Sequence, residues 1–236
     1  MKTKKEFGER DRFVLYLDIM GFKDRVNRVD VEQLKEQLLL FKTKNNKLKP
    51  LLVAGDTKNT LIDMAQFSDS IVLVSRGTTI DDLNRISKAA TILMQTALQT
   101  GFALRGAVSK GKMVFDKENQ LFFGKALVDS YLLEEELCYY GVVFHESMEE
   151  SILEAITKKY MPIEDISIPL KKGMSKHYHI AWHKLTNALQ KGNISSEALD
   201  WLKSLRKTVS GNPRVYLDNT IKIIETTDNV ELHKSV

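Results

Sequence analysis

The sequence predicts an α+β domain, with helices on one face of a sheet and a helical appendage at the C-terminal end. Short apolar runs bounded by glycine and polar residues alternate with longer segments whose apolar residues recur at helical spacing. The first run, FVLYLDI at 13–19, is typical of a buried strand. The predicted order through about residue 160 is βαββαββαβα, which indicates one mixed domain.

The first half of this order follows from local patterns. Two apolar runs, at 59–66 and 70–75, flank the segment FSD and predict two strands joined by a tight connection. Thr79 and Asp82 form a capping pair ahead of a predicted amphipathic helix that ends at Gly101. Between the first strand and this pair, residues 22–45 carry apolar side chains at helical spacing.

Glycines mark the boundaries in the second half. Gly106 interrupts the strand predicted at 102–115, which indicates close backbone approach or a bulge. Gly211-Asn212-Pro213 separates two predicted helices, because asparagine caps a helix and proline suits its first position. We therefore expect a core domain over residues 1–185 and a helical appendage over 194–236. The other predicted elements are helices at 124–137 and 147–160, strands at 121–123 and 141–145, and two less clear strands within 161–193.

Composition excludes several classes of protein. The 236 residues are 43% hydrophobic and 28% charged, and no apolar run approaches the roughly 20 residues that span a bilayer. The net charge of +4 suits a polyanionic ligand such as a nucleotide, whereas the dispersed lysines and arginines do not favour nucleic acid. The basic start has no apolar stretch after it, so we expect no signal peptide. The single Cys138 suits a reducing cytoplasm.

Asp18 stands where the first strand gives way to a helix. Gly21 follows three positions later, and a strand-to-helix turn presents free backbone N–H groups and the positive end of a helix dipole. Phosphate oxygens suit that place, and a carboxylate beside it can hold a metal ion that neutralises the same phosphates. The competing interpretation is that Asp18 only caps the helix.

Asp69 lies in the FSDS connection between the next two strands. If these strands neighbour the first one, Asp18 and Asp69 converge, and two close carboxylates repel each other unless a cation lies between them. Two carboxylates and substrate phosphates are the usual ligands of Mg²⁺ or Mn²⁺. Taken alone, Asp69 is equally well explained as an ordinary turn residue.

Other polar residues carry weaker signals. Cationic residues of the glycine-containing strand, Arg105 and Lys110, suit a triphosphate, although such residues more often form a solvated face. Glu134 and the two glutamates after it are interpreted as a solvated helix end. The histidines have no cysteine or carboxylate at ligand spacing, so we expect ordinary strand and surface residues at His177, His179 and His183.

Four segments, taken in order, resemble the class III nucleotidyl cyclases. They are DIMGF at 18–22, FSDS at 67–70, RGAVSKG at 105–111 and FFGKALVDSYLLE at 122–134. Each segment alone is weak evidence, whereas four in this order are fairly specific. Within that superfamily, the last two segments look most like the pyrimidine cyclases of the bacterial Pycsar anti-phage system. Those enzymes make cyclic CMP or cyclic UMP as an alarm signal.

The resemblance breaks down at the positions that read a purine base. Purine cyclases carry a lysine or glutamate where this chain has Ala65, and often an aspartate where it has Leu121. Neither Ala65 nor Leu121 can hydrogen-bond to a purine, and a pocket without its polar readers loses discrimination. The resemblance therefore favours a pyrimidine substrate over a purine one.

The helix that follows Gly124 departs from the family as well. The usual asparagine and arginine, which orient the ribose and stabilise the transition state, are replaced by Val128 and Leu132. If the protein is active, other groups must supply these functions. The candidates are Arg105, Lys110, Asp129 and Tyr131.

The resemblance implies a ferredoxin-like sheet and a two-metal reaction. The ribose 3′-oxygen of UTP or CTP attacks the α-phosphorus and expels pyrophosphate. Asp18 and Asp69 are the implied ligands of two Mn²⁺ or Mg²⁺ ions, together with the Ile19 carbonyl, and Arg105 is the implied further catalytic residue. A head-to-tail homodimer with its active sites at the interface is also implied. The implied phosphate-binding residues are Met20, Gly21, Phe22, Lys23 and Lys110.

Two other functions are considered. The replaced asparagine and arginine motivate a cyclase-homology module that binds nucleotide without turning it over. A diguanylate cyclase has a related sheet, but its Gly-Gly-Asp/Glu-Glu-Phe signature is absent from this chain. The choice between UTP and CTP does not follow from the sequence.

Overall fold

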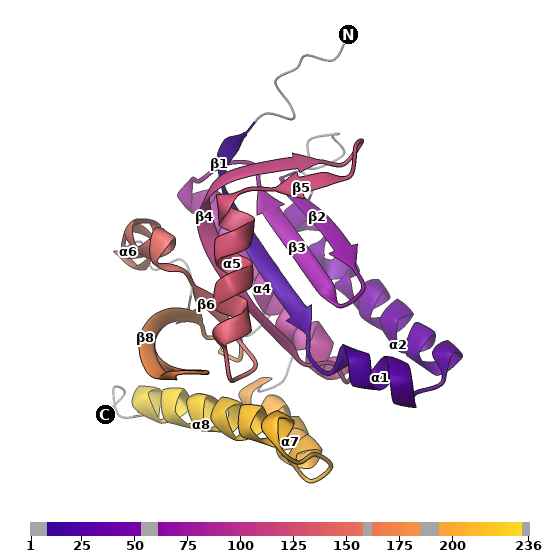
Figure 1. Ribbon diagram of the computed structural model, residues 1–236. Coiled ribbons are helices and arrows are strands. Elements are labelled where there is room, and N and C mark those ends of the chain that lie inside the picture. The colour runs from indigo at the N-terminus through magenta and orange to yellow at the C-terminus, as the bar shows by residue number, and fades with distance from the viewer. Residues whose placement is uncertain (1–8, 53–60, 158–161, 185–193, 233–236) are drawn as a thin grey trace.

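In the computed structural model, the described residues are 9–52, 61–157, 162–184 and 194–232. Within them, eight strands form one sheet in the order β2-β3-β1-β4-β6-β8-β7, with β5 paired to β4 (Figure 1). The first four strands of this order pair with one another in antiparallel orientation, whereas β4 and β6 are parallel. This is the predicted ferredoxin-like arrangement.

The order of strands and helices agrees with the predicted one, except that three described α-helices stand between the first two strands where one was predicted. The strands are β1 (Arg10–Ile19), β2 (Ile62–Phe67), β3 (Ser70–Ser75), β4 (Leu104–Asp116), β5 (Leu121–Phe123), β6 (Val142–Phe144), β7 (Ile163–Leu170) and β8 (Gly173–Ile180). The helices are α1 (Phe22–Arg28), α2 (Val31–Lys44), α3 (Lys49–Leu52), α4 (Ile80–Gln99), α5 (Lys125–Glu136), α6 (Glu149–Thr157), α7 (Ile194–Arg206) and α8 (Asn212–Leu232).

Strand β1 lies inside the sheet, paired with β3 on one side and β4 on the other. Its side chains alternate between the two faces, as the period of a strand requires. Phe13 and Leu15 join the main core cluster with α4, whereas Val14 packs with Ala126 of α5. Gly106 of β4 fits the predicted close approach, because a Cβ there would lie 2.4 Å from the Tyr16 carbonyl oxygen.

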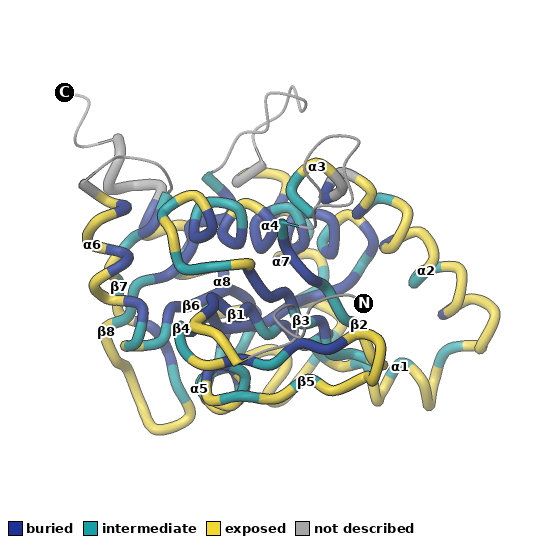
Figure 2. Tube along the Cα trace, turned by 90° about the horizontal axis from the view of Figure 1, so that it is seen from above, coloured by how far each residue is buried: buried dark blue, intermediate teal, exposed yellow. Residues whose placement is uncertain are grey.

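Helices cover both faces of the sheet, so the prediction of helices on one face is right for α2 and α4 but wrong for α5. Figure 2 shows the buried strands between α4 and α5. Small residues allow α5 to approach β4 closely. A Cβ on Gly124 would lie 2.3 Å from the Lys112 carbonyl oxygen, and Ser109 Oγ donates to the Ala126 carbonyl at 2.5 Å. Because the buried residues of α5 are Ala126, Ser130 and Glu134, the helix has no stripe of large apolar side chains. Its packing on the second face of the sheet could therefore not be predicted from the sequence.

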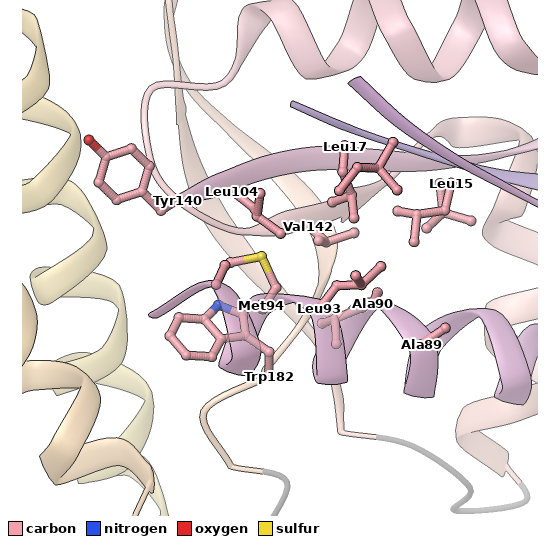
Figure 3. Close-up of a cluster of buried hydrophobic side chains, with 14 of the residues drawn as sticks. Leu15, Leu17, Ala89, Ala90, Leu93, Met94, Leu104, Tyr140, Val142 and Trp182 are labelled. Carbon is pink, nitrogen blue, oxygen red and sulfur yellow. The ribbon is translucent and has the colours of Figure 1, made fainter. Parts of the chain in front are cut away.

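The main core lies between the sheet and α4. Figure 3 shows Leu17 of β1 and Leu104 of β4 across from Leu93 and Met94 of α4. Burying a leucine side chain stabilises the fold by roughly 1.5–3 kcal/mol. The predicted capping pair begins α4: Thr79 Oγ1 accepts the Asp82 N–H at 3.2 Å, and Asp82 Oδ2 accepts the Thr79 N–H at 3.1 Å.

The helical segment predicted at 22–45 consists of two helices. Helix α1 ends at Arg28, and Asp30 begins α2 by accepting the N–H groups of Glu32 at 2.9 Å and Gln33 at 3.3 Å. An aspartate side chain that binds these N–H groups favours a helix start over continuation of the preceding helix. The break leaves α1 as a short helix directly after Asp18.

The C-terminal helices share the core of the sheet. Leu202 of α7 and Leu217 of α8 are buried in the same cluster as β1 and α4. Thr220 Oγ1 accepts the Tyr140 N–H at 2.8 Å, which joins α8 to the segment before β6. The division of the chain into units at 1–185 and 194–236 stays a prediction. None of the described helices is long and apolar enough to cross a membrane.

Candidate active site

Asp18 is the penultimate residue of β1 and has a directly opposed residue on each side. Ser70 of β3 and Arg105 of β4 occupy these positions. Directly opposed residues project from the same face of a sheet, so the three side chains belong to one site. This is the face that α5 covers, because Val14 on the same face packs with Ala126.

A two-residue turn between β2 and β3 brings Asp69 to Asp18. Ser68 in this turn adopts a left-handed conformation, with φ of 54°. The Asp69 carbonyl accepts the N–H of Ile19 at 2.9 Å, which ties the turn to the end of β1. The two aspartates are 51 positions apart in the sequence, and the structure brings them together.

The charges at this site oppose one another. Burial and the neighbouring Asp69 carboxylate raise the pKa of Asp18 from 3.8 to about 6, while the Arg105 guanidinium lowers it. Repulsion between two carboxylates is relieved when a cation binds between them. A cation between the two carboxylates would therefore stabilise this arrangement.

The donor set fits a divalent cation. Mg²⁺ and Mn²⁺ are commonly held by one or two carboxylates together with substrate phosphates, and Asp18 and Asp69 provide two. Within the described parts of the chain, no group of three or more His, Cys, Asp or Glu side chains offers an alternative metal site. The ligand role of the Ile19 carbonyl stays a prediction.

The turn after Asp18 has the shape that its glycine predicts. Gly21 has φ of 72° and ψ of 15°, and its carbonyl accepts the Arg25 N–H at 3.1 Å. Only glycine adopts this left-handed conformation without cost. The predicted phosphate-binding role of Met20 is not supported, because its N–H donates to the Ala103 carbonyl at 2.9 Å. The first-turn N–H groups of Gly21, Phe22 and Lys23 stay candidates.

Arg105 and Glu134 form a buried ion pair beside Asp18. Arg105 Nε donates to Glu134 Oε1 at 2.5 Å, and Arg105 Nη1 donates to the Leu137 carbonyl at 2.8 Å. The prediction that Glu134 belongs to a solvated helix end is wrong, since only 2% of it is exposed. Burial raises the pKa of Glu134 to about 7, and Arg105 opposes that rise. The Arg105 guanidinium thus lies between two carboxylates, Asp18 and Glu134, and lowers the pKa of both.

Lys110, which was expected to bind the substrate phosphates, lies far from Asp18 within one chain. It pairs with Phe13, five residues before Asp18 on β1, which is about 17 Å at the rise of a strand. Its Nζ lies 3.5 Å from Ser151 Oγ and 4.0 Å from Glu150 Oε2. The long β4 therefore places Arg105 opposite Asp18 and Lys110 opposite Phe13, at different points along β1.

Two tyrosines lie at this site: Tyr131 is one of the candidates named from the sequence, whereas Tyr16 was missed. The Tyr16 hydroxyl lies 2.8 Å from Ser70 Oγ, and its ring meets the Tyr131 ring edge-on with 5.4 Å between centroids. Burial raises the pKa of Tyr16. Tyr16 stands two positions before Asp18, so the two-residue period of a strand places both on one face.

The α5 positions that depart from the family face outward. Val128 and Leu132 are 53% and 54% exposed. Of the groups considered as replacements for asparagine and arginine, Asp129 is ion-paired to Lys125 at 2.5 Å, whereas Tyr131 contacts Tyr16 beside Asp18.

A groove of about 460 Å³ runs beside the aspartates between β2–β3 and the β4–β5 hairpin. Its apolar lining residues are Met64, Ala65, Phe67, Val72 and Phe122. Leu121, where the family resemblance places a base-reading residue, is 52% exposed and does not line this groove. The polar lining residues are Gln66, Ser70, Lys117 and Gln120.

Comparison with known proteins adds the last piece of evidence. No protein-family model matches the sequence, and no curated protein matches it. The structure is similar to the catalytic core of a rhodopsin-guanylyl cyclase with converted specificity in complex with ATPαS. The identity is 12%, the TM-score 0.53, and the match covers 74% of this chain and 97% of the other.

A second similar structure is a bacterial light-regulated adenylyl cyclase. The identity is 10% and the TM-score 0.53, over 86% of this chain and 100% of the other. At this level of identity the likeness concerns the fold. The chain has the class III nucleotidyl cyclase fold, as the four ordered segments predict.

Proposed function

We propose that this protein is a nucleotidyl cyclase that converts UTP or CTP to the 3′,5′-cyclic monophosphate and pyrophosphate. The observation that carries the proposal is the paired carboxylates of Asp18 and Asp69 at the end of β1 on a class III cyclase fold. Two carboxylates held in mutual repulsion cost stability, which is typical of sites kept for function rather than for folding.

In the proposed reaction, the ribose 3′-oxygen forms a bond to the α-phosphorus. The bond from that phosphorus to the bridging oxygen breaks, pyrophosphate leaves, and the hydroxyl proton passes to solvent. Two divalent cations, Mn²⁺ or Mg²⁺, supply neutralisation of phosphate charge and a lower pKa for the attacking hydroxyl. Asp18 and Asp69 are the residues that hold them.

The surrounding residues have supporting roles in this proposal. Arg105 favours the ionised form of Asp18, since its positive charge lowers the pKa of that carboxyl. The backbone N–H groups of Gly21, Phe22 and Lys23 bind phosphate oxygens at the start of α1. Tyr131 is positioned beside Tyr16 and takes the place of the asparagine and arginine that α5 lacks.

The groove beside the aspartates supports a pyrimidine substrate. Ala65 and Val72 face each other across β2 and β3 and give it an apolar floor. Gln66 and Gln120 can each donate and accept hydrogen bonds, as the polar edge of a pyrimidine requires. Lys117 is the one charged side chain among the described residues that line the groove. Its Nζ lies 3.1 Å from Asp63 Oδ1, so this charge is already paired and is not assigned to reading a purine base.

Exposed apolar side chains near the site support the proposed homodimer. Phe67, beside Asp69, is 86% exposed, and Phe123 is 57% exposed. Together with Leu121, Val128 and Leu132 they surround the site face with apolar surface, which in a soluble protein commonly marks an interface. A head-to-tail dimer covers this surface and adds the partner's groups to each site.

The biological role rests on the family resemblance. The segments at 105–111 and 122–134 look like those of the pyrimidine cyclases of bacterial anti-phage defence. A cyclic pyrimidine nucleotide made in the cytoplasm as an alarm signal is the corresponding proposal.

One assay tests activity and base choice together. The protein is incubated with each of ATP, GTP, CTP and UTP in the presence of Mn²⁺, and the cyclic product and pyrophosphate are quantified. Cyclic UMP or cyclic CMP alone supports the proposal. A cyclic purine product contradicts the base assignment. Nucleotide binding without any product supports the alternative of a module that does not turn nucleotide over.

A further inference from the structure

A second cavity lies between α1 and the C-terminal helices, outside the proposed base and metal sites. Its volume is about 330 Å³, at the lower end of the range of pockets that bind small organic molecules. Helix α1 and the Met20–Gly21 turn form one wall, and α7 with the start of α8 forms the other. The cavity lies beside the C-terminal helices and shares Gly21 with the proposed phosphate site, whereas its other lining residues have no role in the proposed reaction.

The far wall of this cavity is aromatic and held in place. Trp201, Tyr140 and Tyr216 line it, and the rings of Tyr140 and Tyr216 meet edge-on with 6.2 Å between centroids. Figure 3 shows the Tyr140 ring reaching from the core cluster towards the C-terminal helices. The bond from the Tyr140 N–H to Thr220 Oγ1 fixes this wall to α8. A flat, prearranged aromatic wall favours a planar apolar ligand.

The near wall carries an excess of positive charge. Arg25 and Arg28 of α1 line the cavity with one carboxylate, Asp24. Arg25 is held in position, because its guanidinium donates to the Gly101 carbonyl and to Gln37 Oε1 and lies 4.8 Å from the Phe102 ring centroid. The exposed Arg28 has no ion pair or hydrogen bond from its side chain to any described residue. One guanidinium at the rim is thus available to an acid group.

We propose that this cavity binds a small aromatic anion, with its ring against Trp201 and Tyr216 and its acid group at Arg28. A guanidinium prefers a planar carboxylate or a sulfonate-like oxygen pair, to which it can donate two hydrogen bonds. The aromatic wall and the cationic rim lie on opposite sides of the same cavity, so one molecule with both features contacts both.

The position of the cavity gives the ligand a route to the proposed active site. Met20 and Gly21 line the cavity and follow Asp18 by two and three positions. The hydrogen bond from the Met20 N–H to the Ala103 carbonyl joins two lining residues. A bound ligand therefore holds the turn that begins α1. Any effect on turnover rests on the proposed cyclase function, whereas binding does not.

The first test is binding in the absence of nucleotide and metal. The probe is 8-anilinonaphthalene-1-sulfonate, compared with N-phenyl-1-naphthylamine, which has the same rings without the acid group. The sulfonate is expected to bind at least about five-fold more tightly, as one charge-assisted contact allows. Equal affinity for the two probes overturns the assignment of an anion.

Variants locate the site. Val209→Trp, which fills the cavity, is expected to abolish the tight component of probe binding. Arg28→Gln is expected to weaken sulfonate binding about five-fold and leave the neutral probe unchanged. Arg214→Gln, a matched exposed arginine outside the lining, is the control and is expected to change nothing. Unaltered sulfonate binding in both Val209→Trp and Arg28→Gln overturns the proposal.

A third measurement reports on the turn itself. Hydrogen exchange of the amides from Met20 to Lys23 is expected to slow when the sulfonate probe is bound, and to stay unchanged with the probe in Val209→Trp. Because it needs no turnover, this result is independent of the cyclase assay. If the protein proves inactive on all four nucleotides yet binds the probe here, the proposed function fails and the cavity assignment stands.

Discussion

Asp18 and Arg105 lie directly opposite each other across β1 and β4, at the end of the sheet where the Asp69 turn closes over them. Burial and Asp69 raise the pKa of Asp18 by more than the Arg105 guanidinium lowers it, so that the pKa reaches about 6. The folded protein without a cation therefore holds an aspartate whose charge is poorly compensated.

Replacing Asp18 by asparagine should stabilise the metal-free protein at pH 8. A raised carboxyl pKa means that the folded state binds a proton more tightly than the unfolded state, so the penalty develops as the pH rises from 3.8 to about 6. The shift of about two units corresponds to about 3 kcal/mol. Because Asp18 is partly exposed, solvent screening reduces the expected gain to about 1 kcal/mol.

Urea unfolding at pH 8 and at pH 4 checks this expectation. The advantage of Asp18→Asn should be present at pH 8 and absent at pH 4, where Asp18 is already protonated. Asp11→Asn, at an exposed aspartate of the same strand, is the control and should have little effect. A destabilised Asp18→Asn protein at pH 8 contradicts the view that this carboxylate is held under repulsion.

The Arg105–Glu134 pair should show strong coupling in a double-mutant cycle. Glu134→Leu leaves a buried guanidinium without its ionic partner, and we expect a loss of about 3 kcal/mol in the free energy of unfolding. Arg105→Met in the same protein should recover most of that loss, because the unpaired charge is then gone. Additive effects of the two substitutions, measured by urea unfolding, rule out a structural ion pair.

The free energy of unfolding should fall at acid pH because of His183, which follows β8 and contacts Thr227 of α8. Burial lowers the pKa of His183 to about 3, and His183 Nε2 lies 3.0 Å from Thr227 Oγ1. A lowered histidine pKa means that the unfolded state binds protons first, so this contribution is complete above pH 6.5 and is lost as the pH falls towards 3. Thermal unfolding between pH 7 and pH 4 should show a shallower decline for His183→Gln than for the wild type.

Phe67→Asp should weaken the proposed dimer. Phe67 is 86% exposed beside Asp69, and a charge there is expected to shift sedimentation towards the monomer and to lower turnover together. Val31→Asp changes an equally apolar side chain, 73% exposed on α2, and serves as the matched control. A wild type that sediments as a monomer while fully active shows that each site is complete in one chain.

Local signals predicted the fold and the aspartate pair well. The Thr79–Asp82 capping pair and the close approach at Gly106 follow from short-range chemistry that the sequence displays directly. Asp18 and Asp69 meet because the ferredoxin-like order places β3 next to β1, which the ordered motifs anticipate. Short-range patterns, together with the sheet order that the family resemblance implies, were sufficient to predict these features.

Partners that depend on packing were not predictable. Glu134 belongs to a run of three glutamates, and only the placement of α5 against β4 shows that it is the one that faces Arg105. Lys110 was misplaced because counting along β4 does not reveal how far that strand extends beyond the site. The cavity beside Arg28 joins residues nearly 190 positions apart, such as Arg28 and Tyr216, and no sequence pattern connects them.

The most direct test of the central claim is turnover by the two aspartate variants. Asp18→Asn and Asp69→Asn keep the size of each side chain and remove its charge, so their effect reports on cation binding rather than on packing. With CTP or UTP and Mn²⁺, wild-type protein should release pyrophosphate and the cyclic monophosphate, and each variant should fall to background while remaining folded. Release of pyrophosphate at the wild-type rate by either variant contradicts the assignment of Asp18 and Asp69 as the metal-holding pair.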